Sequence, residues 1–183
     1  PQLFRHYLTA AVAFADERPD WWDYVGGRFY QEYVPVCNEL FKGGWVSQGT
    51  STYGPGKLFS YLWSGWLVQS ATGEMPYDYD GMKNCTYDLL GQVMPNGRYF
   101  QSGDGNRNRE GTAVSSHWMF ITSAMFNDDV TLAAAKKFSS NYTKFNNTDF
   151  QTTTPSLVLI YLFYSNESSS CLGSSPSRLN DMR

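Results

Sequence analysis

Apolar residues recur at intervals of three and four along most of this chain, in segments that end at glycine or proline. Leu3, Tyr7, Ala11 and Phe14 form the first such series, which stops at residues 16–19. This spacing places the four side chains on one face of an α-helix. Runs in which apolar and polar residues alternate, as in a half-buried strand, are not convincing anywhere in the sequence. The chain is therefore predicted to be all-α.

The same spacing predicts six more helices. Asp20 is expected to cap the second, which runs to about residue 41 and is kinked at Pro35 because proline lacks a backbone donor. The remaining helices are expected at residues 58–70, 82–93, 114–125, 130–138 and 156–164. Short links between them favour antiparallel helical hairpins about 45 residues apart, which can curve into part of an (α/α) toroid. Residues 1–167 are predicted to form this partial toroid, and the serine-rich residues 168–183 a linker.

Composition excludes several classes of function. The net charge of −3 and the absence of a basic face argue against nucleic-acid binding. No apolar run approaches the ~18 residues that span a bilayer, so no membrane span is expected. Cys37, Cys85 and Cys171 lack the spacing of zinc ligands, and no metal or other cofactor is expected within the chain. Aromatic residues make up 17% of the chain, and their flat rings suit carbohydrate faces as well as cores.

A glycine-rich corner at residues 44–57 separates two apolar helical segments and carries Tyr53. Residues 54–56, Gly-Pro-Gly, end one backbone direction and start another. We therefore expect the Tyr53 hydroxyl to face a cleft, where it can exchange a proton with a bound sugar. The alternative is a packing role, since the chain holds 13 tyrosines and most tyrosines near turns only pack.

Four sequence blocks follow one another along the chain. They are YLTAAVAFADERP (7–19), GRFYQEY (27–33), SQGTSTY (47–53) and PNGRYFQSGDG (95–105). In order and spacing they resemble the helical toroid portion of the heparinase II/III-like polysaccharide lyases, and the resemblance extends over nearly the whole chain. It implies a periplasmic or secreted enzyme in which the toroid is joined to a β-sandwich domain. This chain would then be a fragment of a larger lyase, with the rest of the same polypeptide as its partner.

The resemblance implies β-elimination on an anionic, uronic-acid-containing polysaccharide. In such enzymes a tyrosine of the third block acts on the sugar ring and on the leaving oxygen. An ungapped register puts Thr52 at that position, but only the neighbouring Tyr53 can do the chemistry. A tyrosine acts as a base only where nearby positive charge favours the phenolate, whereas as an acid it protonates the leaving oxygen directly. Tyr53 is accordingly predicted to be the general acid, and also the base for one uronate epimer.

Several residues are expected to bind the substrate around Tyr53. They are Trp45, Gln48, Thr52 and Lys57 near the corner, and Asp104 and Arg107 in the polar loop at residues 96–111. The family's histidines fall outside residues 1–183 in this register, so the fragment alone is expected to show little or no turnover. His6 and His117 match neither position and are interpreted as structural residues.

Two other functions remain open from the sequence. Helical toroids also host inverting glycoside hydrolases, which need two carboxylates about 6.5 to 9.5 Å apart, and Glu39 with Asp104 is the pair this chain offers. A noncatalytic glycan-binding module, with aromatic residues along a groove, is the third reading. The appearance of an unsaturated uronate product separates the lyase from the hydrolase. Tyr53→Phe separates the lyase from the binding module, because it should abolish elimination but leave the affinity of a module nearly intact.

Overall fold

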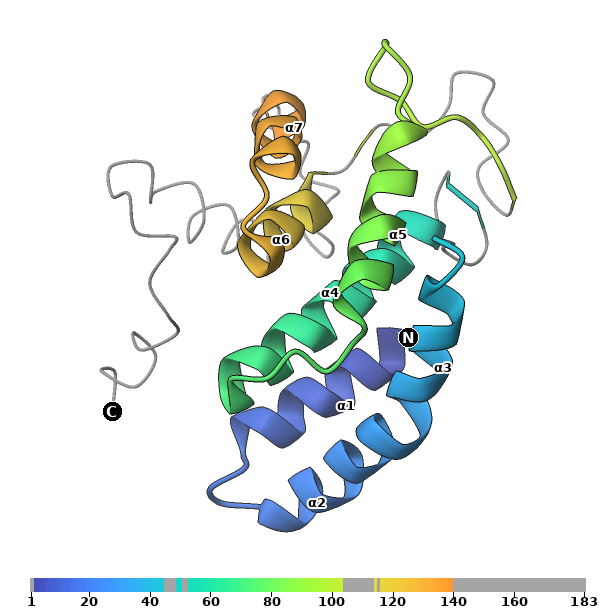
Figure 1. Ribbon diagram of the computed structural model, residues 1–183. Helices are drawn as coiled ribbons and strands as arrows, with labels where there is room; N and C mark the ends of the chain where they lie inside the picture. The colour runs from blue at the N-terminus through green and yellow to red at the C-terminus, as the bar shows by residue number, and fades with distance from the viewer. Residues whose placement is uncertain (1, 45–48, 51–52, 104–113, 115, 140–183) are drawn as a thin grey trace. The chain divides into compact units, whose positions relative to one another are not determined.

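The computed structural model describes residues 2–44, 49–50, 53–103, 114 and 116–139, and its described elements are helices (Figure 1). Apart from a single bridge between Val93 and Tyr99, no strand pairing occurs within these residues. The all-α prediction is confirmed for this part of the chain. The helix predicted at residues 156–164 and the linker at 168–183 lie outside it. The chain divides into two compact units, Pro1–Ala113 and Val114–Arg183.

The first unit opens with a helical hairpin of α1 (Gln2–Ala13) and α2 (Pro19–Arg28). Pro19 occupies the first turn of α2, where a missing backbone donor costs nothing. The prediction that Asp20 caps this helix is wrong, because the cap position belongs to Arg18 and no side chain caps there. Asp20 lies inside the first turn and instead pairs with the Arg18 guanidinium at 2.7 Å.

A π-helical turn, η1 (Phe29–Tyr33), joins α2 to α3 (Val34–Phe41) where one continuous helix was predicted. The backbone N–H of Val34 donates to the carbonyl of Phe29, five residues back. Pro35 follows immediately and has no N–H to continue the ordinary ladder. The irregular turn thus lies directly ahead of the proline that was predicted to disturb this helix.

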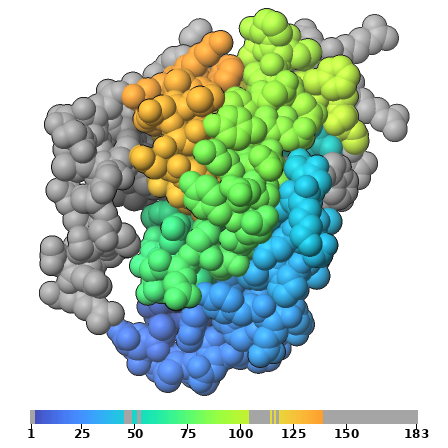
Figure 2. Space-filling view, viewed as in Figure 1, coloured from blue at the N-terminus to red at the C-terminus, as the bar shows by residue number. Residues whose placement is uncertain are grey.

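Helix α4 (Tyr53–Thr72) is the longest in the first unit and lies beside α1 (Figures 1 and 2). The indole N–H of Trp63 donates to the Thr9 hydroxyl at 3.1 Å, and the Arg5 guanidinium lies 5.0 Å from the centre of the Phe59 ring. The two helices therefore run in the same direction. Burial lowers the pKa of the half-buried Arg5. As predicted, α4 is apolar around most of its circumference, and ten of its twenty residues are buried.

Helix α5 (Tyr79–Gly91) packs against α3 and α4. The Asp78 carboxylate caps it by accepting from the Gly81 N–H at 3.1 Å. After α5 the chain turns back on itself, with the Phe100 N–H donating to the carbonyl of Gln92 at 2.8 Å. This turn brings the fourth sequence block back toward the start of α4.

A cluster of aromatic rings, here called the aromatic layer, forms much of the core of the first unit. Its members come from α1, η1, α3, α4 and the segment before α5, and are Phe4, Phe29, Tyr33, Phe41, Tyr61 and Tyr77. Centroids of neighbouring rings lie 4.7–6.0 Å apart, in both stacked and edge-to-face arrangements. These distances are typical of aromatic pairs that stabilise a core beyond the area they bury.

The second unit contains the hairpin of α6 (His117–Phe126) and α7 (Asp129–Ser139). Asn127 takes the left-handed conformation (φ 48°) that ends α6. The Asp128 carboxylate then accepts from the Thr131 N–H at 2.9 Å and caps α7. Both helices fall close to the predicted ranges, with α6 starting three residues later than expected. Among the described helices of either unit, none has the length and apolarity needed to cross a membrane.

Candidate functional site

Tyr53 is the first residue of α4, and its side chain is 53% exposed. The prediction of a helix break around this residue is wrong in one respect: the helix begins five residues before the predicted Leu58 and includes residues 54–56. Pro55 is compatible with this because the first turn of a helix needs no backbone donor from it. The phenol is therefore held on a helix terminus and is accessible to solvent.

The segment just before Tyr53 is attached to the loop at residues 100–103. The Thr50 N–H donates to the carbonyl of Ser102 at 3.2 Å, and the Thr50 hydroxyl donates to the carbonyl of Phe100. A further hydrogen bond of 3.1 Å joins the Thr50 and Ser102 hydroxyls. Thr50 itself is buried, with 6% exposure. The third and fourth sequence blocks thus come into contact at Thr50, three residues before Tyr53.

Gly49 makes this close approach possible. A Cβ at this position would lie 1.9 Å from the carbonyl oxygen of Ser102, well inside any real contact distance. Its φ of +80° also lies in the left-handed region that favours glycine. Both facts require glycine here, and the backbones of the two segments touch as a consequence. We call residues 49–50, 53 and 100–103 together the Tyr53 corner.

The structure places only part of the predicted site. Lys57 lies one turn along α4 from Tyr53 and is half-buried. The other predicted substrate-binding residues lie outside the described part of the chain, namely Trp45, Gln48, Thr52, Asp104 and Arg107. Their role remains a prediction.

The structure also describes residues that were interpreted as structural histidines or as part of a hydrolase pair. His6 is exposed on α1 and accepts a hydrogen bond from Arg5 at 3.0 Å. His117 starts α6, and its side chain is outside the described set. Glu39, nominated for a hydrolase pair, is exposed and forms an ion pair with Lys42 on its own helical segment. Its nominated partner, Asp104, is not among the described residues.

The described thiols are not suited to nucleophilic or metal chemistry. Cys37 and Cys85 are buried, and burial raises the pKa of each to about 12. A thiol that stays protonated is a poor nucleophile and a poor metal ligand. Across the described residues, no three His, Cys, Asp or Glu side chains gather to form a candidate metal site.

A groove of about 1290 Å³ runs along α1, α2, η1 and α3. Its described lining includes neither Tyr53 nor Lys57. The groove and the Tyr53 corner are thus separate features of the first unit.

Sequence reasoning missed three residues of the corner. Thr50, Phe100 and Ser102 were read only as parts of the third and fourth blocks, although they join those blocks in space. Gly49 was one signal that could have found them, because glycine is the residue that allows a close backbone approach. A glycine does not reveal which segment approaches it, and here that segment, residues 100–103, lies about fifty residues further along the chain.

The chain was compared with protein-family models, with curated proteins and with solved structures, and none of the three comparisons finds a match.

Proposed function

We propose that this chain is part of a polysaccharide lyase that cleaves a uronic-acid-containing polysaccharide by β-elimination, with Tyr53 as the general acid/base. The observation that carries the proposal is the exposed Tyr53 phenol on the first turn of α4, next to the contact between residues 49–50 and 100–103. The described elements are helices, which supports the helical domain that the four sequence blocks imply.

β-Elimination makes two demands on such a site. A base removes the proton on the carbon beside the uronate carboxyl, and the electron pair forms a carbon–carbon double bond as the bond to the leaving oxygen breaks. That oxygen then needs a proton, which the Tyr53 hydroxyl supplies. The geometry needed is a phenol that can reach a sugar in solvent, and the exposure of Tyr53 supports it.

Negative charge accumulates on the uronate carboxylate during this step. Backbone N–H groups at a helix N-terminus favour anions, and a nearby cation favours them further. Tyr53 lies at the N-terminus of α4, and Lys57 is one turn along the same helix. Both features support a substrate carboxylate next to Tyr53. The histidines implied by the family, and the β-sandwich, would come from other residues of the same polypeptide.

The test is Tyr53→Phe in the longest natural polypeptide that contains residues 1–183. Turnover is followed by the absorbance of the unsaturated uronate product on alginate and glycosaminoglycan substrates. We expect a loss of about 10²- to 10⁴-fold, the usual effect of removing a general acid or base. Tyr79→Phe is the matched control, since Tyr79 is also exposed and also begins a helix.

Two results would contradict the proposal. Release of reducing ends without the unsaturated product would indicate a hydrolase. Glycan binding that survives Tyr53→Phe, with no turnover on any of these substrates by the unsubstituted protein, would indicate a noncatalytic module.

A further inference from the structure

The groove in the first unit is lined by exposed aromatic rings on both sides. Tyr7 comes from α1, and Trp21 and Tyr24 come from α2; their exposed fractions are 58%, 39% and 66%. One face of the Trp21 ring is covered by the Arg18 guanidinium, 4.5 Å from its centre, which restrains the ring. The volume of about 1290 Å³ exceeds the 300–1,000 Å³ typical of small-ligand pockets. The groove is therefore large enough for a ligand of several linked units.

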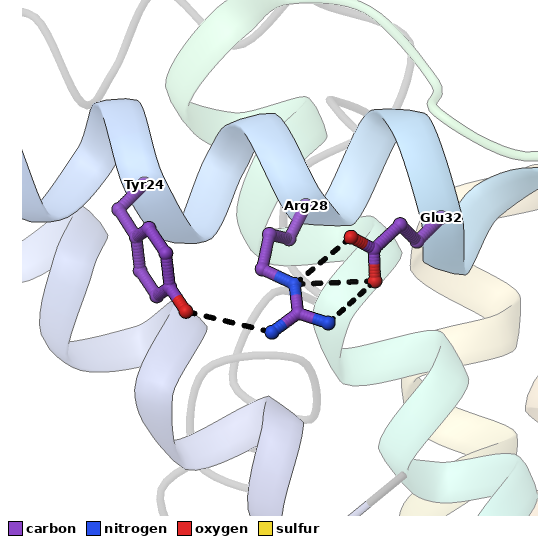
Figure 3. A network of polar contacts seen from close by, with 3 residues as sticks. All are labelled: Tyr24, Arg28 and Glu32. Atoms are coloured by element: carbon purple, nitrogen blue, oxygen red, sulfur yellow. Dashed lines mark hydrogen bonds and ion pairs between the residues drawn. The ribbon is translucent and has the colours of Figure 1, made fainter.

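A polar network lies along one wall of the groove (Figure 3). The Arg28 guanidinium donates to the Glu32 carboxylate through Nε and Nη2, with a shortest distance of 2.6 Å. Its Nη1 donates to the Tyr24 hydroxyl at 3.5 Å. The hydrogen bonds from Arg28 lower the pKa of Glu32. In Figure 3 the three side chains extend from the same side of the α2–η1 helix, where they present both donors and acceptors.

Charges in the groove are balanced within the protein. Arg28 is compensated by Glu32, and Asp20, the other charged residue of the described lining, is compensated by Arg18. A strongly charged ligand would meet no excess of opposite charge there. The complementary ligand is uncharged, with apolar faces that match the mostly apolar lining and with groups that donate and accept hydrogen bonds at the network.

We propose that this groove binds an oligosaccharide through its uncharged pyranose units, at a site separate from Tyr53. The apolar faces of the sugar rings stack on Tyr7, Trp21 and Tyr24, and their hydroxyls bond to the Tyr24–Arg28–Glu32 network. The choice of a saccharide among uncharged, hydroxyl-bearing ligands rests on the proposed function, and the units bound here are those of the polymer that carry no carboxylate. An apolar protein helix fits the groove less well. It would remove the Arg28–Glu32 pair from solvent and would offer the pair no hydrogen bonds in exchange for those that water can make.

The test is calorimetric titration of residues 1–183 with two uncharged hexasaccharides, cellohexaose and chitohexaose, and with an acidic one, a guluronate hexamer. We expect saturable binding of at least one uncharged probe. Tyr24→Ala should weaken it about fivefold or more, because the ring and its hydroxyl are lost together. Tyr30→Ala should leave it unchanged, since Tyr30 is an exposed tyrosine of the adjacent turn that does not line the groove.

Glu32→Gln tests the charge argument directly. It keeps the shape of the side chain but leaves Arg28 without its counter-ion. We expect the acidic hexamer to gain affinity by about twofold to fivefold, as for one exposed ion pair.

Three outcomes would overturn the proposal: no saturable binding of either uncharged probe, equal losses from Tyr24→Ala and Tyr30→Ala, or a groove occupied by a second copy. The last would appear as a concentration-dependent dimer in sedimentation that Tyr24→Ala dissociates. Failure here is distinct from failure of the proposed lyase function. Tyr53→Phe should leave binding in the groove intact, and elimination that depends on Tyr53 would stand even if the groove bound no sugar.

Discussion

The aromatic layer and the Tyr53 corner are both built from residues far apart in the sequence, but different forces hold them. In the aromatic layer, rings from several helices pack against one another, and Phe29 is fully buried. In the Tyr53 corner, two loops are joined by hydrogen bonds of Thr50 and by a backbone contact that only Gly49 permits. The first arrangement depends on buried volume, and the second depends on backbone geometry.

This difference determines how substitutions act in each region. Loss of a ring in the aromatic layer removes buried contacts and leaves a cavity, so it destabilises the whole first unit. Loss of geometry at the corner disturbs one short contact while the helices on either side stay packed. The aromatic layer should therefore control stability, whereas the corner should control the position of Tyr53.

The largest effect on stability is expected from Phe29→Ala. The side chain is fully buried and contacts the rings of Phe4, Tyr33 and Tyr77. We expect the free energy of unfolding to fall by about 3–5 kcal/mol in urea denaturation. Tyr30→Ala removes the next ring, which is 41% exposed and makes an edge contact with Phe29 at 5.4 Å between centroids, so it should cost less, about 1–2 kcal/mol. Similar losses from both would show that the aromatic layer is not the main source of stability.

A smaller effect is expected from Gly49→Ala. The new methyl group would overlap the Ser102 carbonyl, and the left-handed backbone adds strain, for a total of about 2–3 kcal/mol. Gly44→Ala is the control because Gly44 also has a positive φ (+65°) but has nothing within 4 Å of the added Cβ. It should show only the strain, about 1 kcal/mol.

The difference between these two variants isolates the contact between the loops. In a protein with lyase activity, Gly49→Ala should also lower turnover more than Gly44→Ala does. Equal effects on unfolding would mean that residues 49 and 102 do not touch in solution.

The same contrast explains what the sequence could predict. A helix is visible in a sequence as apolar residues at intervals of three and four, and this pattern involves only residues close together in the chain. For that reason α1, α4 and α7 were predicted from Leu3, Leu58 and Phe138 and their neighbours. Ends were less predictable. Asp20 has a side chain that commonly caps a helix, and the helix was expected to start after it. Pro19 instead takes the first helical position, so α2 starts one residue before Asp20.

Only one of the two segments that form the Tyr53 corner could be predicted from the sequence. The sequence identified Tyr53 and the glycine-rich segment, because local composition reveals them. The partners of Thr50 depend on how α5 and the following turn bring residues 100–103 back, and no local pattern encodes that return. The groove was missed as well, since Tyr7 belongs to the apolar series of the first predicted helix yet remains exposed.

The smallest effect at neutral pH is expected from Tyr77→Phe, within the aromatic layer. The Tyr77 hydroxyl is buried and interacts with the Ser64 side chain without the geometry of a full hydrogen bond, so its removal should change the free energy of unfolding by less than about 1 kcal/mol, or should increase it. Alkaline pH should reveal a role for this group. Burial raises the pKa of Tyr77 well above its usual value near 10, so the folded protein keeps a proton that the unfolded chain loses.

Its contribution to stability is therefore complete below about pH 10 and is lost as the pH rises toward the folded pKa. Cys37 and Cys85 act in the same direction from about pH 9, because burial raises the pKa of each to about 12. Urea denaturation from pH 7 to 11 should show stability falling above pH 9, and falling less steeply above pH 10 in Tyr77→Phe. Tyr30→Phe controls for the loss of one phenol. If Tyr77→Phe instead costs several kcal/mol at pH 7, the hydroxyl forms a strong hydrogen bond, and the aromatic layer depends on directed polar contacts as the Tyr53 corner does.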